Sequence, residues 1–201
     1  TTFMFFSGLD LCAISPEYIL SSDSYRRNLD QISEYISLNF NDVSGKTLYV
    51  ISPLNLLQIV SSDRILNANR KLNDESKSCK FLQTNGFRLE SKNESIEANF
   101  LKNSISSLNA ICPTLFALHN DKNQELRLLM SDYLTKYRAA LKSWADTNPL
   151  KEKGLKIVYL ESTKNIQFNA EDIASDCFHF SAEGQKKIAK SISEELKKAS
   201  I

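Results

Sequence analysis

Three short runs of β-propensity residues constrain the fold of this chain most, because each is mainly apolar. The runs lie at residues 2–7, 46–51 and 155–160, and long polar or helix-patterned stretches separate them. Strands covered on both faces are continuously apolar rather than alternating. Parallel strands also need long crossover connections, which are usually helices. The order predicts an α/β fold with a parallel sheet and helices on its faces.

Helical periodicity fills the intervals between these strands. Ser22, Asp23 or Ser24 is predicted to cap a helix that continues to about Phe40, because apolar residues recur there every three or four positions. A second long helix is expected from about Asn123 to Asp146, ended by Asn148-Pro149. A last helix carries its apolar face at Ile188, Ile192 and Leu196.

Residues 62–120 differ in composition from the rest of the chain. They are rich in Asn, Ser and Lys and hold two of the four cysteines, Cys79 and Cys112. We interpret this stretch as a partly helical insertion in a single domain, which a Cys79–Cys112 disulfide would close. His119, within it, has no orienting carboxylate at a suitable spacing and is expected to be a solvated loop histidine.

The four cysteines are more typical of disulfides in an oxidising compartment than of a metal site. They are widely separated, without the Cys-x-x-Cys spacing of zinc ligands, so no metal is expected. Four cysteines allow three disulfide connectivities, and four buried thiols are the alternative. Together with the glycosylation sequon at Asn93, the cysteines favour a secreted or lumenal glycoprotein.

Composition narrows the classes of function. A net charge of +1 gives no field that would collect nucleic acid or an anionic membrane. No run of about 18 apolar residues is present, so no transmembrane helix is expected.

The start at Thr1 lacks the basic and cleavage regions of a signal peptide. A domain that begins with a buried strand is expected to need a further N-terminal segment or chain, bound tightly.

The strongest candidate for chemistry is Asp176-Cys177-Phe178-His179, directly ahead of the last helix. At this spacing an aspartate can hold a histidine Nδ1 and leave Nε2 free to accept a proton from a nucleophile. An Asp-x-x-His sequence is also common as a purely structural feature. A chance occurrence in an unrelated α/β binding protein is therefore a further alternative.

Three blocks carry a resemblance to a known family. Residues 176–184 (Asp-Cys-Phe-His-Phe-Ser-Ala-Glu-Gly) resemble the last block of the SGNH/GDSL hydrolases, in particular of the phospholipase B branch. Residues 7–12 (Ser-Gly-Leu-Asp-Leu-Cys) are a degraded match to the Gly-Gly-Asn-Asp-Leu-Cys block, and Ile111-Cys112-Pro113 is also similar. The resemblance implies a three-layer, flavodoxin-like α/β/α domain, of which residues 1–201 form the C-terminal portion.

The resemblance also implies roles for individual residues. His179 takes the place of the general base and Asp176 that of its orienter, in an enzyme that hydrolyses carboxylic esters of lipids without a cofactor. The family's nucleophilic serine stands in a Gly-Asp-Ser motif, which residues 1–201 do not contain. We therefore expect that serine on an N-terminal segment or partner chain, and neither Ser7 nor Ser181 is a candidate. This chain alone is predicted to be inactive.

Two departures from the family pattern favour an alternative function. Leu9 occupies the position of an asparagine whose side chain donates to the oxyanion, and Ser7 replaces a glycine. Loss of one oxyanion donor typically costs a factor of about 10²–10³ in rate. The alternative is a catalytically inactive SGNH-fold protein that serves as a structural or binding subunit of a larger assembly.

The resemblance finally implies a disulfide pairing. It places the loops that carry Cys12 and Cys177 side by side at the edge of the sheet. We therefore expect Cys12–Cys177, with Cys79–Cys112 as the second disulfide.

Overall fold

A parallel sheet forms the centre of the molecule. The computed structural model describes residues 1–5, 9–13, 15–72, 75–85, 112–116 and 124–199. The sheet has the order β1-β2-β5, from the strands β1 (Thr2–Phe5), β2 (Thr47–Ile51) and β5 (Lys156–Leu160). Both pairs are parallel, with Leu48 opposite Thr2 on one side and Ile157 on the other. The predicted parallel sheet is confirmed.

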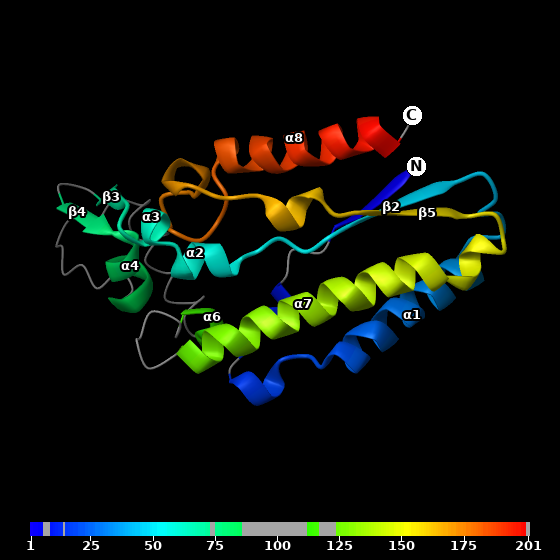
Figure 1. The fold of residues 1–201 in the computed structure, drawn as a ribbon, viewed down its shortest axis with the longest axis horizontal. Helices are drawn as coiled ribbons and strands as arrows, with labels where there is room; N and C mark the ends of the chain where they lie inside the picture. The colour runs from blue at the N-terminus through cyan, green and yellow to red at the C-terminus, as the bar shows by residue number, and fades with distance from the viewer. Residues whose placement is uncertain (6–8, 14, 73–74, 86–111, 117–123, 200–201) are drawn as a thin grey trace.

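Helices cover both faces of the sheet. Helix α8 (Ala182–Ala199) lies on one face, and α1 (Ser22–Asn39) and α7 (Gln124–Thr147) lie together on the other (Figure 1). The fold is therefore the expected α/β/α arrangement. Among the described residues, no helix combines the length and the apolar character that a membrane span requires.

The contact between α1 and α7 is made by both aromatic and polar side chains. The rings of Tyr25 and Tyr137 are stacked with their centroids 4.5 Å apart. Ser33 is buried and its hydroxyl accepts hydrogen bonds from Trp144 Nε1 at 3.0 Å and Asn148 Nδ2 at 2.7 Å. One serine on α1 thus joins the end of α7 to the next turn of the chain, as a buried polar group requires partners.

The ends of the two long helices agree closely with the sequence pattern. The cap of α1 is Ser21, one residue before the predicted candidates, and its hydroxyl accepts from the Ser24 backbone N–H at 3.2 Å. Helix α7 ends before Asn148, whose side chain accepts from Leu150 N. The short apolar helix α2 (Leu57–Ser61), packed after β2, was not predicted.

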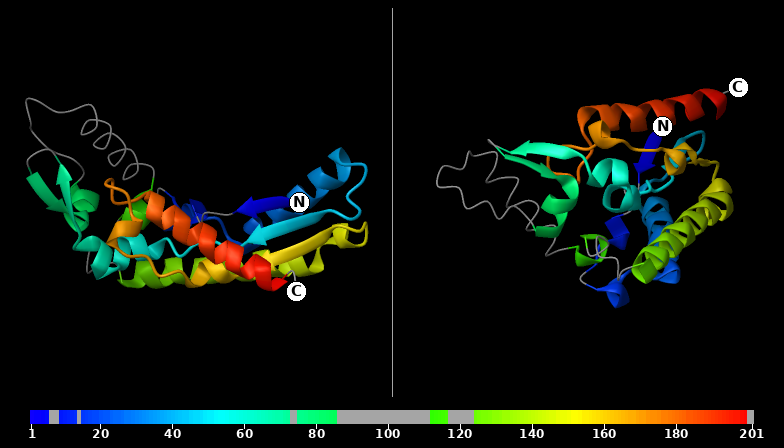
Figure 2. Two further views of the ribbon diagram at one scale, coloured as in Figure 1. Left: turned by 90° about the horizontal axis from the view of Figure 1, so that it is seen from above. Right: turned by 60° about the vertical axis from the view of Figure 1, so that its left-hand side comes forward.

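The described part of residues 62–120 contains a hairpin as well as helices. Strands β3 (Asn69–Leu72) and β4 (Glu75–Ser78) pair antiparallel and lead into α4 (Cys79–Asn85). The helices α3 (Asp63–Leu66) and α6 (Pro113–Phe116) belong to the same stretch. Figures 1 and 2 show β3, β4 and α4 at the end of the molecule toward which the strands of the main sheet run. Asn93 and His119 lie outside the described residues.

Strand β1 is only partly covered in the described part of this chain, although its sequence is apolar. Of the described strands it pairs only with β2, and the side chains of Phe3 and Phe5 remain 51% and 46% exposed. Phe3 is covered on one side by Tyr49, with ring centroids 5.1 Å apart. An apolar edge strand of this kind presents free backbone groups to a further strand.

The two disulfides have a different connectivity from the one expected. Cys12 bonds to Cys112 and Cys79 bonds to Cys177, with Cα–Cα distances of 4.7 Å and 5.4 Å. The predicted pairs Cys12–Cys177 and Cys79–Cys112 are wrong because the short helices decide which cysteines meet. The Thr114 hydroxyl, on α6, hydrogen-bonds to backbone groups of the segment 11–13 and thereby brings Cys112 to Cys12.

Peptide mapping without reduction tests this connectivity. We expect linked peptides that contain Cys12 with Cys112 and Cys79 with Cys177, because only these pairs lie within bonding distance. Mass spectrometry of native protein, alkylated before digestion, measures the links, and a reduced sample is the control. A Cys12–Cys177 peptide, or four alkylated thiols, would contradict the structure.

Candidate active site

Asp176 and His179 form a hydrogen-bonded pair in the loop before α8. Asp176 Oδ2 lies 2.5 Å from His179 Nδ1. The other carboxylate oxygen, Oδ1, accepts from the backbone N–H groups of Phe178 and His179, each at 3.0 Å. Both oxygens are therefore engaged, and the short loop from 176 to 179 is folded around the carboxylate. The structure thus brings together the two residues that the sequence singled out.

The burial of the two side chains differs strongly. The Asp176 side chain is 10% exposed, whereas that of His179 is 62% exposed. A carboxylate only accepts, so Nδ1 carries the hydrogen and the lone pair of the neutral ring is on Nε2. Within the described residues, no side chain hydrogen-bonds to Nε2. The geometry is that of an oriented base whose reactive nitrogen has no partner in the described part of this chain.

The turn that holds the pair has an unusual backbone. Cys177 has φ of 60°, in the left-handed region that non-glycine residues rarely adopt. Around it, Ala174 N donates to the His179 carbonyl at 2.8 Å, and Ile173 bridges to Phe180. The conformation at Cys177 costs about 1–2 kcal/mol and so persists only where surrounding contacts fix it.

Residues from β3 and α4 make such contacts. Gln83 Nε2 donates to the Cys177 carbonyl at 2.6 Å, and Arg70 Nη2 donates to the carbonyls of Ala170 at 2.6 Å and Ile173 at 3.1 Å. Burial lowers the pKa of the Arg70 guanidinium, and the negative charge of Asp176 partly opposes that shift. Together with the Cys79–Cys177 disulfide, these bonds fix the loop from the side of the insertion.

The remaining residues of the last sequence block begin helix α8. Ser181 Oγ accepts from Gly184 N at 3.2 Å and donates to the Glu171 carbonyl at 2.6 Å. Asp172, which is buried, pairs with Lys187 at 2.6 Å and thereby ties the preceding turn to α8. Ser181 is accordingly a helix-capping residue in this structure, consistent with its exclusion as a nucleophile.

The first sequence block reaches the same region through α6. Leu11 is fully buried, and its carbonyl accepts from the Thr114 hydroxyl at 2.9 Å. On the same helix, the ring of Phe116 lies 5.5 Å from that of Phe178, next to His179. Leu9 begins the short helix η1 (Leu9–Leu11) that follows β1, and Ser7 lies outside the described residues. Helix α6 thus connects the first and the last of the three blocks that carry the resemblance.

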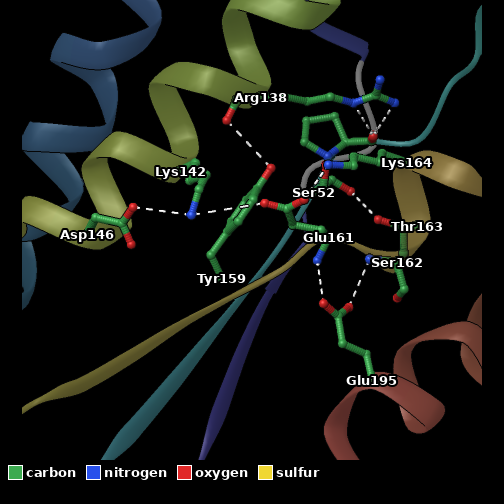
Figure 3. A network of polar contacts seen from close by, with 11 residues as sticks. Ser52, Arg138, Lys142, Asp146, Tyr159, Glu161, Ser162, Thr163, Lys164 and Glu195 are labelled. Carbon is green, nitrogen blue, oxygen red and sulfur yellow. Dashed lines mark hydrogen bonds and ion pairs between the residues drawn. The ribbon is translucent and has the colours of Figure 1, made fainter. Parts of the chain in front are cut away.

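A polar network fixes the connection from β5 to the Asp–His loop. The carboxylate of Glu195, on α8, accepts from the backbone N–H groups of Glu161 and Ser162, each at 2.8 Å (Figure 3). The Thr163 hydroxyl donates to the Ser52 carbonyl at 2.6 Å. These bonds hold α8 and the loop after β5 against the end of β2.

Comparison with known protein families agrees with this arrangement. The family described as GDSL-like Lipase/Acylhydrolase matches residues 21–192, most of the chain. The chain belongs to this family. A search of curated proteins finds no match. The matched range includes the Asp176–His179 pair of this GDSL-family chain as well as β2, α7 and β5.

Sequence reasoning singled out Asp176 and His179 but missed the residues that support their loop. Arg70 and Gln83 lie in the stretch interpreted as an insertion, where no periodicity or motif marks them. Their function depends on how the β3–β4 hairpin and α4 fold back onto the loop after β5. The cysteines were the one available signal, since Cys79 stands four positions before Gln83 and bonds to Cys177.

A substitution at Gly184 tests how tightly α8 packs on the loop. A Cβ at this position would overlap the backbone carbonyl of Asp172, which cannot move aside as a flexible side chain would. We expect Gly184→Ala to lower the free energy of unfolding by about 1–3 kcal/mol, as overpacking does. Urea unfolding measures this effect. The control is Ser193→Ala, at an exposed position of the same helix, with an expected change within about 0.5 kcal/mol. A neutral or stabilising Gly184→Ala would contradict the close packing.

Proposed function

We propose that this chain supplies the general base and its orienter to a serine hydrolase of lipid carboxylic esters. The observation that carries the proposal is the Asp176–His179 pair, with Nδ1 held at 2.5 Å and the rest of the ring exposed. Membership of a lipase and acylhydrolase family supports an ester as the substrate. The resemblance of residues 176–184 to the phospholipase B branch supports a phospholipid or related lipid.

The reaction follows from the free lone pair on His179 Nε2. That nitrogen takes the proton from a serine hydroxyl while the serine oxygen attacks the ester carbonyl carbon. The resulting imidazolium, stabilised by Asp176, gives the proton to the departing alcohol. A water molecule, deprotonated by the same nitrogen, then hydrolyses the acyl-serine and releases the carboxylic acid.

The serine in this proposal lies on a segment or partner chain outside residues 1–201. Support comes from the edge of β1 that no described strand pairs with, where Phe3 and Phe5 are about half exposed. A further parallel strand paired there would end at the same edge of the sheet as the loops that lead to Asp176 and His179. The strand's exit loop is where the family's Gly-Asp-Ser motif stands.

The compartment of this function is proposed to be secreted or lumenal. The two disulfides, Cys12–Cys112 and Cys79–Cys177, support it, because the cytosol keeps thiols reduced.

A second candidate is an inactive member of the family that acts as a structural or binding subunit. The specific observation in its favour is Leu9, which has no hydrogen-bond donor in its side chain where the family places an asparagine. The two functions differ in whether an activated serine exists in the complete protein.

Labelling with a fluorophosphonate probe distinguishes them. We expect the full-length native protein, with any partner chain, to be labelled on one serine outside residues 1–201. His179→Gln should slow labelling by about 10²–10⁴-fold, because the serine loses its base. Mass spectrometry of the labelled peptide locates the serine.

His119→Gln is the matched control, since it removes the other histidine and should leave labelling unchanged. No labelling of the native protein would favour the inactive subunit. A labelled serine within residues 1–201 would contradict the proposed origin of the nucleophile.

A further inference from the structure

We propose that Arg70 and Gln83 are positioning residues for the Asp176–His179 pair, so that the segment 69–85 acts as a brace for the general base. The segment comprises the β3–β4 hairpin and α4, and its described residues contact the loop before α8 at three separate points. This inference rests on the proposed function and assigns that site two residues with no counterpart in its sequence motif.

Gln83 binds the peptide group between Cys177 and Phe178, inside the turn. It is fully buried, and its amide nitrogen lies 2.6 Å from the Cys177 carbonyl and 3.3 Å from that of Ile59, on α2. The Cys177 carbonyl belongs to the peptide whose N–H, that of Phe178, donates to Asp176 Oδ1. Gln83 and Asp176 thus fix the two ends of a single peptide plane, Gln83 at the carbonyl and Asp176 at the N–H.

Arg70 holds the chain immediately before the turn. One terminal nitrogen donates to the carbonyls of Ala170 and Ile173, which lie on either side of the buried Asp172. Its positive charge also interacts favourably with Asp176 and Glu171. Arg70 therefore contributes both a two-point hydrogen bond to this stretch and a positive charge close to Asp176.

The third contact is covalent, and it falls on the residue with the strained backbone. Cys177, with φ of 60°, bonds to Cys79 at the start of α4, while Gln83 on the same helix binds its carbonyl. A left-handed residue between Asp176 and His179 needs external fixation, and a misplacement of about 1 Å can cost about 10²-fold in rate. The contacts of α4 converge on this residue.

Hydrogen exchange at the turn tests the brace independently of any activity. The backbone N–H groups of Phe178 and His179 donate to Asp176 Oδ1, so their exchange reports opening of the pair. Gln83→Leu and Arg70→Met should each speed this exchange by about tenfold relative to other slowly exchanging amides of the full-length protein, because a buried bond to the turn is lost. NMR of ¹⁵N-labelled protein measures both amides.

Two matched variants remove equivalent bonds elsewhere. Gln58 donates to the Ile166 carbonyl at 2.7 Å and accepts from Phe168 N at 3.0 Å, earlier in the same loop. Arg138 donates twice to the Pro53 carbonyl, at 3.1 Å and 2.9 Å (Figure 3). Gln58→Leu and Arg138→Met should lower global stability comparably and leave exchange at the two reporter amides unchanged relative to the rest of the protein.

Arg70→Lys separates the two contributions of the arginine. A lysine keeps the charge near Asp176 but loses the planar fork, so exchange should lie between that of the wild type and of Arg70→Met. This variant and Gln83→Met, which keeps the length of the side chain and removes the amide donor without burying a charge, also serve if a larger change prevents folding. Equal exchange at the turn in wild type and all these variants would overturn the brace.

Kinetics then connect the brace to the proposed function. In the full-length protein, Gln83→Leu should lower kcat for a lipid ester by about tenfold or more with KM within about twofold, since binding groups are untouched. A change in KM alone would contradict positioning of the base. Absence of any esterase activity would count against the proposed function, whereas the exchange measurement would still decide the brace.

Discussion

The parallel pairing of β1, β2 and β5 determines where the polar loops of this protein lie. Because all three strands run the same way, their carboxyl ends meet at one edge, and each return connection must cross a face of the sheet as a helix. The segments after β1 and β5 are thereby brought to one end of the molecule, where α6 packs against both. Leu11 contacts α6 through Thr114, and Phe178 contacts it through Phe116.

The part of the fold that could be predicted is the part determined by the local spacing of apolar residues along the chain. Strand β2, after Gly45, and strand β5, which ends at Leu160, follow from apolar runs. The start of α1 near Ser22 and the end of α7 near Thr147 follow from the caps. The disulfide pairing could not be predicted, because it depends on where α4 and α6 dock after the chain has folded back. The apolar run of β1 shows that this strand can be covered and not what covers it, and in the described part of the chain the strand remains half exposed.

The last sequence block, residues 176–184, also combines features that are set locally with features that depend on distant contacts. Ser181 caps α8 and Gly184 allows that helix to approach the Asp172 carbonyl, so half of the motif serves the helix that follows. Asp176 and His179 serve the pair itself, and their relation was predictable because both lie within one turn. Arg70 and Gln83 reach that turn from about a hundred residues away in the sequence, where a single sequence shows no spacing that connects them.

The position of the brace also bears on the choice between an enzyme and an inactive subunit. A left-handed cysteine, a buried glutamine amide and a half-buried arginine all converge on the turn that presents the exposed His179 side chain. A loop that served only to begin α8 would be held by the Ser181 cap and the Asp172–Lys187 pair, both of which act without His179. Strain concentrated beside an exposed imidazole is more characteristic of a site that must be held in one geometry than of a passive connection. In the proposed reaction Leu9 would concern a different part, the stabilisation of the oxyanion, which other donors can supply. The structure of the turn therefore favours a retained base.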